Sequence, residues 1–507
     1  MTVDPDLAFF SHAVGSYPDV AWQGAVDALR RAGGSNFVVL GFGPEPLLIP
    51  HSALESHCYV VGPSNSGKTS RVLAPLLSQL VAGGHPVWNF DCKPDHGLCG
   101  HIREAARASG RKLHFFSLQP GVPSDFALDI FAALQGAGRT PRQIAELLIG
   151  SLGLNQAAEP FFISENAGLL RAGLEQAAAK GKLSFKALAH EMRAVFAAKR
   201  YQHGSHAMDV MESLAAIPEL NPGKGALPAC DLAACIEKPS VVYFALPVTT
   251  ELKLTSAAVA ALVLKTLVVV GKSLALEGKA VRRTFVSIDE FQDIATVGDL
   301  ASLVSQVRGV GAGISLVLSH QVREQVPEEG GLRELLKTSG VLIVLAPRMF
   351  ADELQQWSGE KVVWMRSDSH TNGSSTGADG KGSTSESRST SWTETIRPAL
   401  ELNLIQAVNA LDGGGFMVVK GGPPQPAFFP HHVSAVEADR RARRAFPKPV
   451  PAAKPVLTLA PQPKLPAPVA AVVALPPSED PLSLRMQRLW LRVAHTVLLP
   501  SLSKTAV

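Results

Sequence analysis

The segment from Gly62 to Thr69, which reads Gly-Pro-Ser-Asn-Ser-Gly-Lys-Thr, restricts what this chain can fold into more than any other feature. It follows the apolar run Cys58–Val61 and precedes a helical pattern, so it predicts a turn that joins a buried strand to a helix. Glycine lets backbone N–H groups approach an anion, and the helix N-terminus adds partial positive charge. The spacing G-x4-G-K-[ST] therefore predicts a phosphate-binding loop, not an ordinary Gly/Ser turn with a solvated lysine.

The residues of this loop have different expected roles. Lys68 is predicted to neutralise the β- and γ-phosphates of ATP, and the Thr69 hydroxyl to ligate Mg²⁺. The nucleotide is expected to contact the loop, the residue after it, and one acid that ends a second apolar strand. The predicted nucleotide-binding residues are Gly62, Pro63, Ser64, Asn65, Ser66, Gly67, Lys68, Thr69, Ser70 and Asp91.

A third apolar strand, 284–288, ends in two carboxylates, Asp289 and Glu290. Hydrolysis of ATP needs one carboxylate that orients Mg²⁺ and one that activates water, and we assign Asp289 and Glu290 to these roles in that order. Asp91 is the alternative candidate for the carboxylate that orients Mg²⁺. Gln321 ends the next strand, where parallel sheets bind ligands, and is predicted to contact the γ-phosphate or the attacking water. Arg308 is either an exposed arginine or a catalytic arginine that reaches the nucleotide of a neighbouring subunit in a ring.

Strand and helix patterns alternate on both sides of the loop. Apolar runs predict strands at 36–40, 47–49, 58–61, 87–91 and 113–118, and again at 241–246, 284–288, 314–318, 341–345, 416–419 and 427–429. Between about 126 and 239 the apolar positions have helical spacing and no strand pattern. The chain is therefore predicted to be an α/β protein with a parallel-rich sheet, 36–125 and 240–435, interrupted by an all-α domain, 126–239.

The other segments are predicted to lie outside this core. Residues 1–35 are expected to be a helical segment, and 367–392 a flexible excursion rich in Ser, Thr and Gly. Residues 447–481 form a Pro/Ala-rich linker that is predicted to be unfolded. Residues 482–500 have the pattern of an amphipathic helix, with arginines beside an apolar stripe.

Composition narrows the class of protein. The chain has 507 residues, of which 46% are hydrophobic and 18% charged, which is typical of a globular protein. A net charge of +4 does not by itself predict nucleic-acid binding, and an odd number of cysteines, five, favours reduced thiols. No signal peptide is found, and the most apolar stretch, Ala257–Gly271, is predicted to be a buried helix that is too short to span a membrane. We therefore expect a cytoplasmic protein.

Taken in order, these motifs resemble those of the type IV secretion coupling proteins, the TraG/TraD-like conjugative DNA-transfer ATPases. The resemblance covers about residues 37–430. The segments that carry it are Gly62–Thr69 followed by Val72–Leu77, Phe90–Lys93, Asp289–Phe291, Gln321–Val326, and Arg397-Pro398 leading to Gly421–Pro424.

The resemblance implies a RecA-like motor domain that carries an all-α domain and forms a homo-hexamer at the inner membrane. It implies ATP and Mg²⁺ as cofactors. It also implies single-stranded DNA, a relaxase and the secretion channel as partners, with Asp289 and Glu290 as Walker B residues, Gln321 as a sensor and Arg308 as a possible trans-acting finger. Many members begin with two membrane-spanning helices, which were not found in this sequence. The helix at 482–500 and the arginines at 440, 441, 443 and 444 could instead contact a membrane peripherally or dock on a partner.

Other functions remain open at this point. The same motor could secrete protein effectors, with the all-α domain as their receptor, or could be a DNA translocase of the FtsK/HerA type. A nucleotide-binding adaptor without hydrolysis is disfavoured by the intact pair Asp289 and Glu290.

Overall fold

The structure is a computed structural model. It describes residues 31, 36–43, 46–154, 160–198, 203–223, 227–249, 253–279, 283–295, 307, 313–321, 339–376, 378, 382–431 and 433–447. The chain divides into two compact units, Met1–Pro451 and Ala452–Val507, and all described residues lie in the first. Arg308, the linker beyond residue 447, the helix at 482–500 and, apart from residue 31, the segment 1–35 fall outside the described residues.

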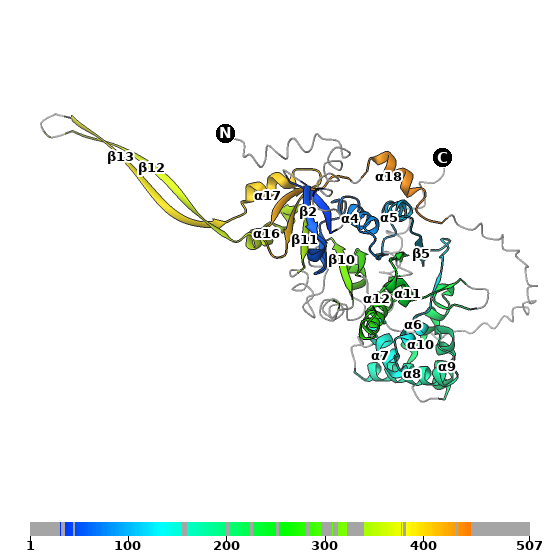
Figure 1. Ribbon diagram of the computed structural model, residues 1–507. Coiled ribbons are helices and arrows are strands. Elements are labelled where there is room, and N and C mark those ends of the chain that lie inside the picture. The colour runs from blue at the N-terminus through cyan, green and yellow to red at the C-terminus, as the bar shows by residue number, and fades with distance from the viewer. Residues whose placement is uncertain are drawn as a thin grey trace, which may run out of the picture. The chain divides into compact units, whose positions relative to one another are not determined.

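The described residues form one large mixed sheet of eleven strands (Figure 1). In spatial order the strands are β2 (Pro46–Pro50), β1 (Phe37–Phe42), β15 (Gln425–Phe428), β14 (Gly414–Val419), β11 (Val341–Leu345), β3 (Cys58–Val61), β10 (Ile314–His320), β9 (Thr284–Asp289), β4 (Val87–Asp91), β8 (Val241–Ala245) and β5 (Leu113–Ser117). From β11 to β5 neighbouring strands pair in parallel, whereas β14, β15, β1 and β2 add an antiparallel edge.

Both faces of this sheet are buried, which explains why its strands are continuous apolar runs instead of alternating ones. In β3, Cys58 and Val60 belong to one hydrophobic cluster, and Tyr59 and Val61 to another. The first cluster includes helices α4 (Ala74–Ala82) and α5 (His96–Ala108). The second includes α12 (Lys253–Leu276) and continues into the helical domain.

The helical domain lies between β5 and β8 in the chain. It contains α6 (Ile130–Gly136), α7 (Pro141–Ser151), α8 (Pro160–Ala179), α9 (Phe185–Ala197), α10 (Ser205–Ala215), the 3-10 turn η2 (Pro218–Leu220) and α11 (Leu232–Glu237). The expectation that this block has no strand is wrong in one detail. The two-residue strands β6 (Ala127–Leu128) and β7 (Ala229–Cys230) pair in parallel where the block begins and ends, and a strand of that length has no sequence period to detect.

The prediction for the most apolar stretch also needs correction. Thr255–Leu276 has a mean hydropathy of 2.0 and is long and apolar enough to cross a membrane, so the stretch was not too short. Most of it is buried within the protein, where α12 contacts α6, α7, α11 and α13 (Gln292–Ala295). A core helix that neighbours surround needs no polar face, which explains its mostly apolar composition.

The segment predicted to be a flexible excursion is paired strand in the structure. β12 (Glu360–Thr376) and β13 (Gly382–Pro398) form an antiparallel hairpin that extends away from the sheet (Figure 1). The pairing is unbroken from Glu360 opposite Pro398 to Thr376 opposite Gly382. The Ser/Thr content misled the prediction because these residues were interpreted as loop formers, whereas threonine and the flanking tryptophans also favour strands.

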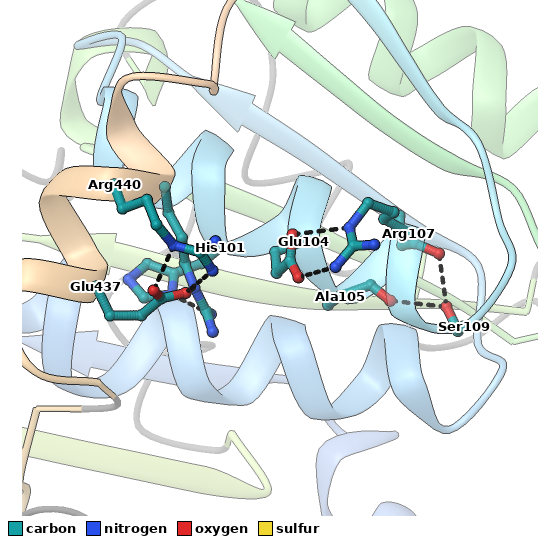
Figure 2. A network of polar contacts seen from close by, with 9 residues as sticks. His101, Glu104, Ala105, Arg107, Ser109, Glu437 and Arg440 are labelled. Atoms are coloured by element: carbon teal, nitrogen blue, oxygen red, sulfur yellow. Dashed lines mark hydrogen bonds and ion pairs between the residues drawn. The ribbon is translucent and has the colours of Figure 1, made fainter.

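Short helices complete the described fold: α3 (His51–Leu54), the π-helical turn η1 (Lys68–Leu73), the 3-10 turn η5 (Pro347–Phe350), α16 (Ala351–Ser358), α17 (Leu402–Asn409) and α18 (Ala435–Ala442). Helix α18 lies against α5, and Figure 2 shows the polar contacts at this junction. Gly100 of α5 allows the close approach, because a Cβ there would lie 2.5 Å from the Arg441 carbonyl oxygen. Burial, together with the Arg441 charge, lowers the pKa of the neighbouring His101 to about 4.

The basic cluster at 440–444 is largely paired within its own helix. Glu437 accepts hydrogen bonds from Arg440 (2.6 Å) and Arg441 (2.7 Å), and Asp439 accepts one from Arg443 (2.9 Å). The first of these pairs is visible in Figure 2. The cluster therefore carries less uncompensated positive charge than its sequence indicates.

Candidate nucleotide-binding site

The predicted phosphate-binding loop connects β3 to the helical turn that begins at Lys68. Gly67 has a φ of 90°, a conformation that side chains disfavour, and a Cβ there would lie 2.5 Å from Arg71 Cδ. A Cβ on Gly62 would lie 2.9 Å from Leu345 Cβ of the neighbouring strand. Both glycines of the motif are thus required by the local geometry.

Lys68 is only 5% exposed, and its ammonium group lies inside the loop. It donates to the carbonyl oxygens of Gly62 (2.8 Å) and Pro63 (3.2 Å). Burial lowers the pKa of Lys68, while the carboxylates of Glu290 and Asp289 act in the opposite direction. Neutral carbonyl partners are weaker acceptors than phosphate oxygens, so the ammonium group is suited to exchange them for an anion.

Thr69 and Asp289 lie together although 220 residues separate them. The Thr69 hydroxyl donates to Asp289 Oδ2 over 2.9 Å, and Ser319 of β10 donates to Asp289 Oδ1. Burial raises the pKa of Asp289, and the hydrogen bonds from Ser319 and Thr69 oppose that rise. A hydroxyl and a carboxylate at this separation are the oxygen ligands that Mg²⁺ prefers, so the residues present fit the ion.

Glu290 begins the turn after β9 with a φ of 54°, a left-handed conformation that non-glycine residues seldom adopt. Its backbone N–H donates to Asp289 Oδ1 (3.1 Å) and to Ser319 Oγ (3.3 Å), which holds the turn in place. Its side-chain Oε2 accepts from the amides of Gln321 (3.1 Å) and Gln292. The carboxylate is therefore oriented by two amide donors at the mouth of the site.

Sheet order explains why these residues meet. β3 and β9 both pair in parallel with β10, so their carboxyl ends lie at one edge of the sheet. The loop after β3, the acids at the end of β9 and Gln321 after β10 are placed at that edge together. Ligands of open parallel sheets bind at this position.

Asp91, which was predicted to contact the nucleotide, bonds to the turn that follows β4. It is fully buried, directly across from Asp289 in the β4–β9 pairing, but it does not line the cavity described below. Its oxygens accept hydrogen bonds from the backbone N–H groups of Lys93 (2.9 Å) and Asp95 (2.6 Å) and from the Tyr243 hydroxyl. Burial, together with the Asp289 charge, raises its pKa to about 7. Asp91 therefore holds the turn after β4 in place.

A cavity of about 700 Å³ opens beside the loop. Predicted residues that line it are Ser64, Asn65, Gly67, Lys68, Thr69, Ser70, Asp289 and Glu290. Gly62, Pro63, Ser66 and Gln321 are not among its lining residues. The lining residues that the sequence reasoning missed are Arg71, Lys93, Pro94, Asp95, His96, Asp412 and His431.

A sequence signal existed for only some of the missed residues. Residues 93–96 follow β4, and the rule that ligands bind beyond parallel strand ends could have identified them. Asp412 and His431 lie in turns beside the antiparallel strands β14 and β15, to which that rule does not apply.

Comparisons with known proteins agree with this architecture. Residues 283–409 match the family model described as the TraM recognition site of TraD and TraG. Among solved structures, the unbound form of the bacterial conjugative coupling protein TrwBdeltaN70 is 17% identical, covers 81% of this chain and 93% of its own, and has a TM-score of 0.54. Plasmid coupling protein TrwB in complex with the non-hydrolysable ATP analogue ADPNP is 16% identical, with coverages of 83% and 95% and a TM-score of 0.56.

TrwB in complex with ADP and Mg²⁺ is 15% identical, covers 80% of this chain and 91% of its own, and has a TM-score of 0.53. Among curated proteins, none matches this sequence. At such identities the solved structures establish the fold, and the predicted RecA-like P-loop NTPase fold is confirmed. The predicted resemblance to the TraG/TraD-like proteins is confirmed as well.

Proposed function

We propose that this chain is an ATP-driven type IV coupling protein, because residues 283–409 match the family model of the TraM recognition site of TraD and TraG. Its cargo in this proposal is single-stranded DNA, delivered as a relaxase–DNA complex and passed to a secretion channel. The similarity to TrwB, a conjugative coupling protein with solved structures in complex with an ATP analogue and with ADP and Mg²⁺, supports the proposal.

One observation carries the enzymatic part of the proposal. The loop lysine and threonine, the two acids after β9 and the amide after β10 meet at one edge of the sheet. A structural role for a buried lysine and two adjacent acids would not need a glycine-lined loop or an open cavity beside them. Binding and hydrolysis of a nucleoside triphosphate accounts for all of these features.

The residues divide the work as follows. Lys68 and the loop N–H groups bind the phosphates, and Thr69 with Asp289 would hold Mg²⁺. Mg²⁺, when bound, neutralises charge on the β- and γ-phosphate oxygens. Glu290 accepts the proton of the attacking water at its carboxylate, and Gln321 fixes the position of that carboxylate through the 3.1 Å hydrogen bond.

The assembly is also part of the proposal. In a homo-hexamer the nucleotide would lie between subunits, and Arg308 of one subunit would reach the phosphates bound by the next. Such a catalytic arginine raises the rate of hydrolysis by a factor of ~10³–10⁵ in other NTPases. Replacing Arg308 by alanine is expected to reduce turnover but not ATP binding.

The proposed function is tested by the coupling of hydrolysis to DNA. We expect single-stranded DNA to stimulate the ATPase of the purified full-length chain, and the stimulation to fall steeply as salt increases, because phosphate contacts release counterions. The Lys68→Ala variant, which is expected not to bind nucleotide, is the control. An ATPase that ignores DNA at all salt concentrations, in oligomeric preparations, would contradict DNA translocation.

Protein cargo is the second candidate, because the matched family, the TraM recognition site of TraD and TraG, is named for a binding partner other than a nucleotide. Deleting the helical domain, 126–239, is expected to abolish retention of a relaxase or effector if that domain is the cargo receptor. Retention without the domain would place the receptor elsewhere.

A further inference from the structure

The cavity beside the phosphate-binding loop is also lined by side chains that phosphate binding does not require. A triphosphate occupies only part of a nucleotide site, and ribose and base need the rest. Three of the lining residues that hydrolysis does not require, Arg71, Asp412 and His431, come from the helix after the loop and from the turns beside β14 and β15.

Sheet order tells which end of the nucleotide these residues face. β3, which leads into the loop, lies between two groups of strands. Asp289 and Glu290 follow β9, two strands from β3 on one side, and they mark the γ-phosphate end. Asp412 precedes β14, two strands from β3 on the other side, and His431 follows β15 beyond it. A nucleotide whose γ-phosphate lies beside Glu290 would then extend its nucleoside towards Asp412 and His431.

The Arg71–Asp412 pair joins two parts of the cavity wall. Arg71 is 8% exposed, and it donates to the Phe429 carbonyl oxygen (3.0 Å) and to Asp412 Oδ2 (2.6 Å). Two glycines make room for its guanidinium: a Cβ on Gly67 would lie 2.5 Å from Arg71 Cδ, and one on Gly413 would lie 2.3 Å from its Nη1. The arginine thus connects the phosphate-binding loop to the turn that carries the aspartate.

Asp412 presents an acceptor to the cavity. Its side chain is 89% exposed, and within the described part of the chain only Arg71 bonds its carboxylate, through Oδ2. A carboxylate repels phosphate, so its ligand has to offer donors, and the vicinal hydroxyls of ribose offer two. The Arg71 charge offsets that of Asp412, which makes a carboxylate tolerable near the α-phosphate. His431 adds an imidazole to this wall, and burial, followed by the Arg71 charge, lowers its pKa.

We infer that Asp412, held in place by Arg71, recognises the ribose hydroxyls and selects ribonucleotides over deoxyribonucleotides. The inference rests on the proposed function, since it names the nucleoside end of the same site.

The test measures dissociation constants of ADP, 2′-deoxy-ADP, 3′-deoxy-ADP and GDP with the full-length chain and Mg²⁺ by calorimetry. A hydrogen bond to a charged acceptor predicts that ADP binds about tenfold more tightly than either deoxynucleotide. In Asp412→Ala this ratio is expected to fall to about one, chiefly because ADP binds less tightly. Asp439→Ala, which removes another exposed aspartate paired with an arginine, is the matched control and should keep the ratio.

The ratio isolates recognition from indirect effects, because a loosened Arg71 would weaken all nucleotides alike. A tenfold preference that survives in Asp412→Ala would overturn the inference, and so would equal binding of ADP and both deoxynucleotides by the unmutated chain. A variant that changes the ADP/GDP ratio but not the ADP/deoxy-ADP ratio would show that Asp412 recognises the base instead. Absence of any Lys68-dependent nucleotide binding would refute the proposed function together with the inference.

Discussion

Replacing Glu290 by glutamine is expected to separate ATP binding from ATP hydrolysis. In the structure, Glu290 Oε2 accepts hydrogen bonds from the amides of Gln321 (3.1 Å) and Gln292. A glutamine carbonyl oxygen can take the same place and accept both bonds, so the turn after β9 should be retained. The second oxygen becomes an amide nitrogen, which cannot accept a proton from water.

The size of the effect follows from that chemistry. A positioned general base contributes ~10²–10⁴ to the rate, so turnover should fall by that factor. This corresponds to about 3–5 kcal/mol in the activation free energy. Affinity for ATP should stay the same or rise, because the loop contacts of Lys68 are untouched and a negative charge beside the γ-phosphate is removed.

The assay compares two measurements on the same purified chain: phosphate release at saturating ATP, and equilibrium binding of ATP. Gln292→Ala is the matched control, since it removes one amide donor but keeps the carboxylate, and it should retain most of the turnover. A Glu290→Gln variant that hydrolyses ATP at the unmutated rate would refute the assignment of the base. Loss of ATP binding together with turnover would show that the residue is structural.

Three further predictions follow from buried contacts. Gly100→Ala should destabilise the protein by ~1–3 kcal/mol in thermal unfolding, because its Cβ would clash with the backbone of α18 at 2.5 Å, whereas Gly136→Ala, with open space around it, should not. Asp91 has a native pKa of about 7, against about 4 when unfolded, so the native state binds an extra proton between these values. Its contribution to stability therefore falls as pH rises from 4 to 7, and Asp91→Asn should flatten urea-unfolding free energies over that range; an unchanged slope would contradict this. Ser319→Ala removes the donor to the buried metal-ligand candidate and should raise the Mg²⁺ concentration for half-maximal ATPase by ~10-fold; an unchanged Mg²⁺ dependence would show that this hydrogen bond does not matter.

Much of the fold was predictable because its signals are local. A parallel strand that is buried on both sides must be an apolar run, as 241–245 and 341–345 are, and such runs can be recognised without knowing their neighbours. The hairpin at 360–398 was missed because Ser and Thr occur in loops and in exposed strands alike. The length of helix α12 was underestimated because an apolar segment contains no residue pattern that shows where the helix ends.

The candidate site divides in the same way. Spacing alone predicts Lys68 and Thr69, because a loop that wraps phosphate needs glycines at fixed positions in one short segment. The pair after β9 was also predictable, since two adjacent acids follow an apolar strand there. Asp91 had the same local pattern, yet its carboxylate is bonded to the turn beside it and is buried.

By itself, then, the amino-acid sequence determined the loop, the strands and the acids at their ends, because each depends on residues that are neighbours along the chain. Only the tertiary structure decided which of the acids face the cavity and that Arg71 pairs with Asp412, 341 positions away. The physical reason is that the order of strands in a sheet is set by packing between distant segments, and no local spacing encodes it.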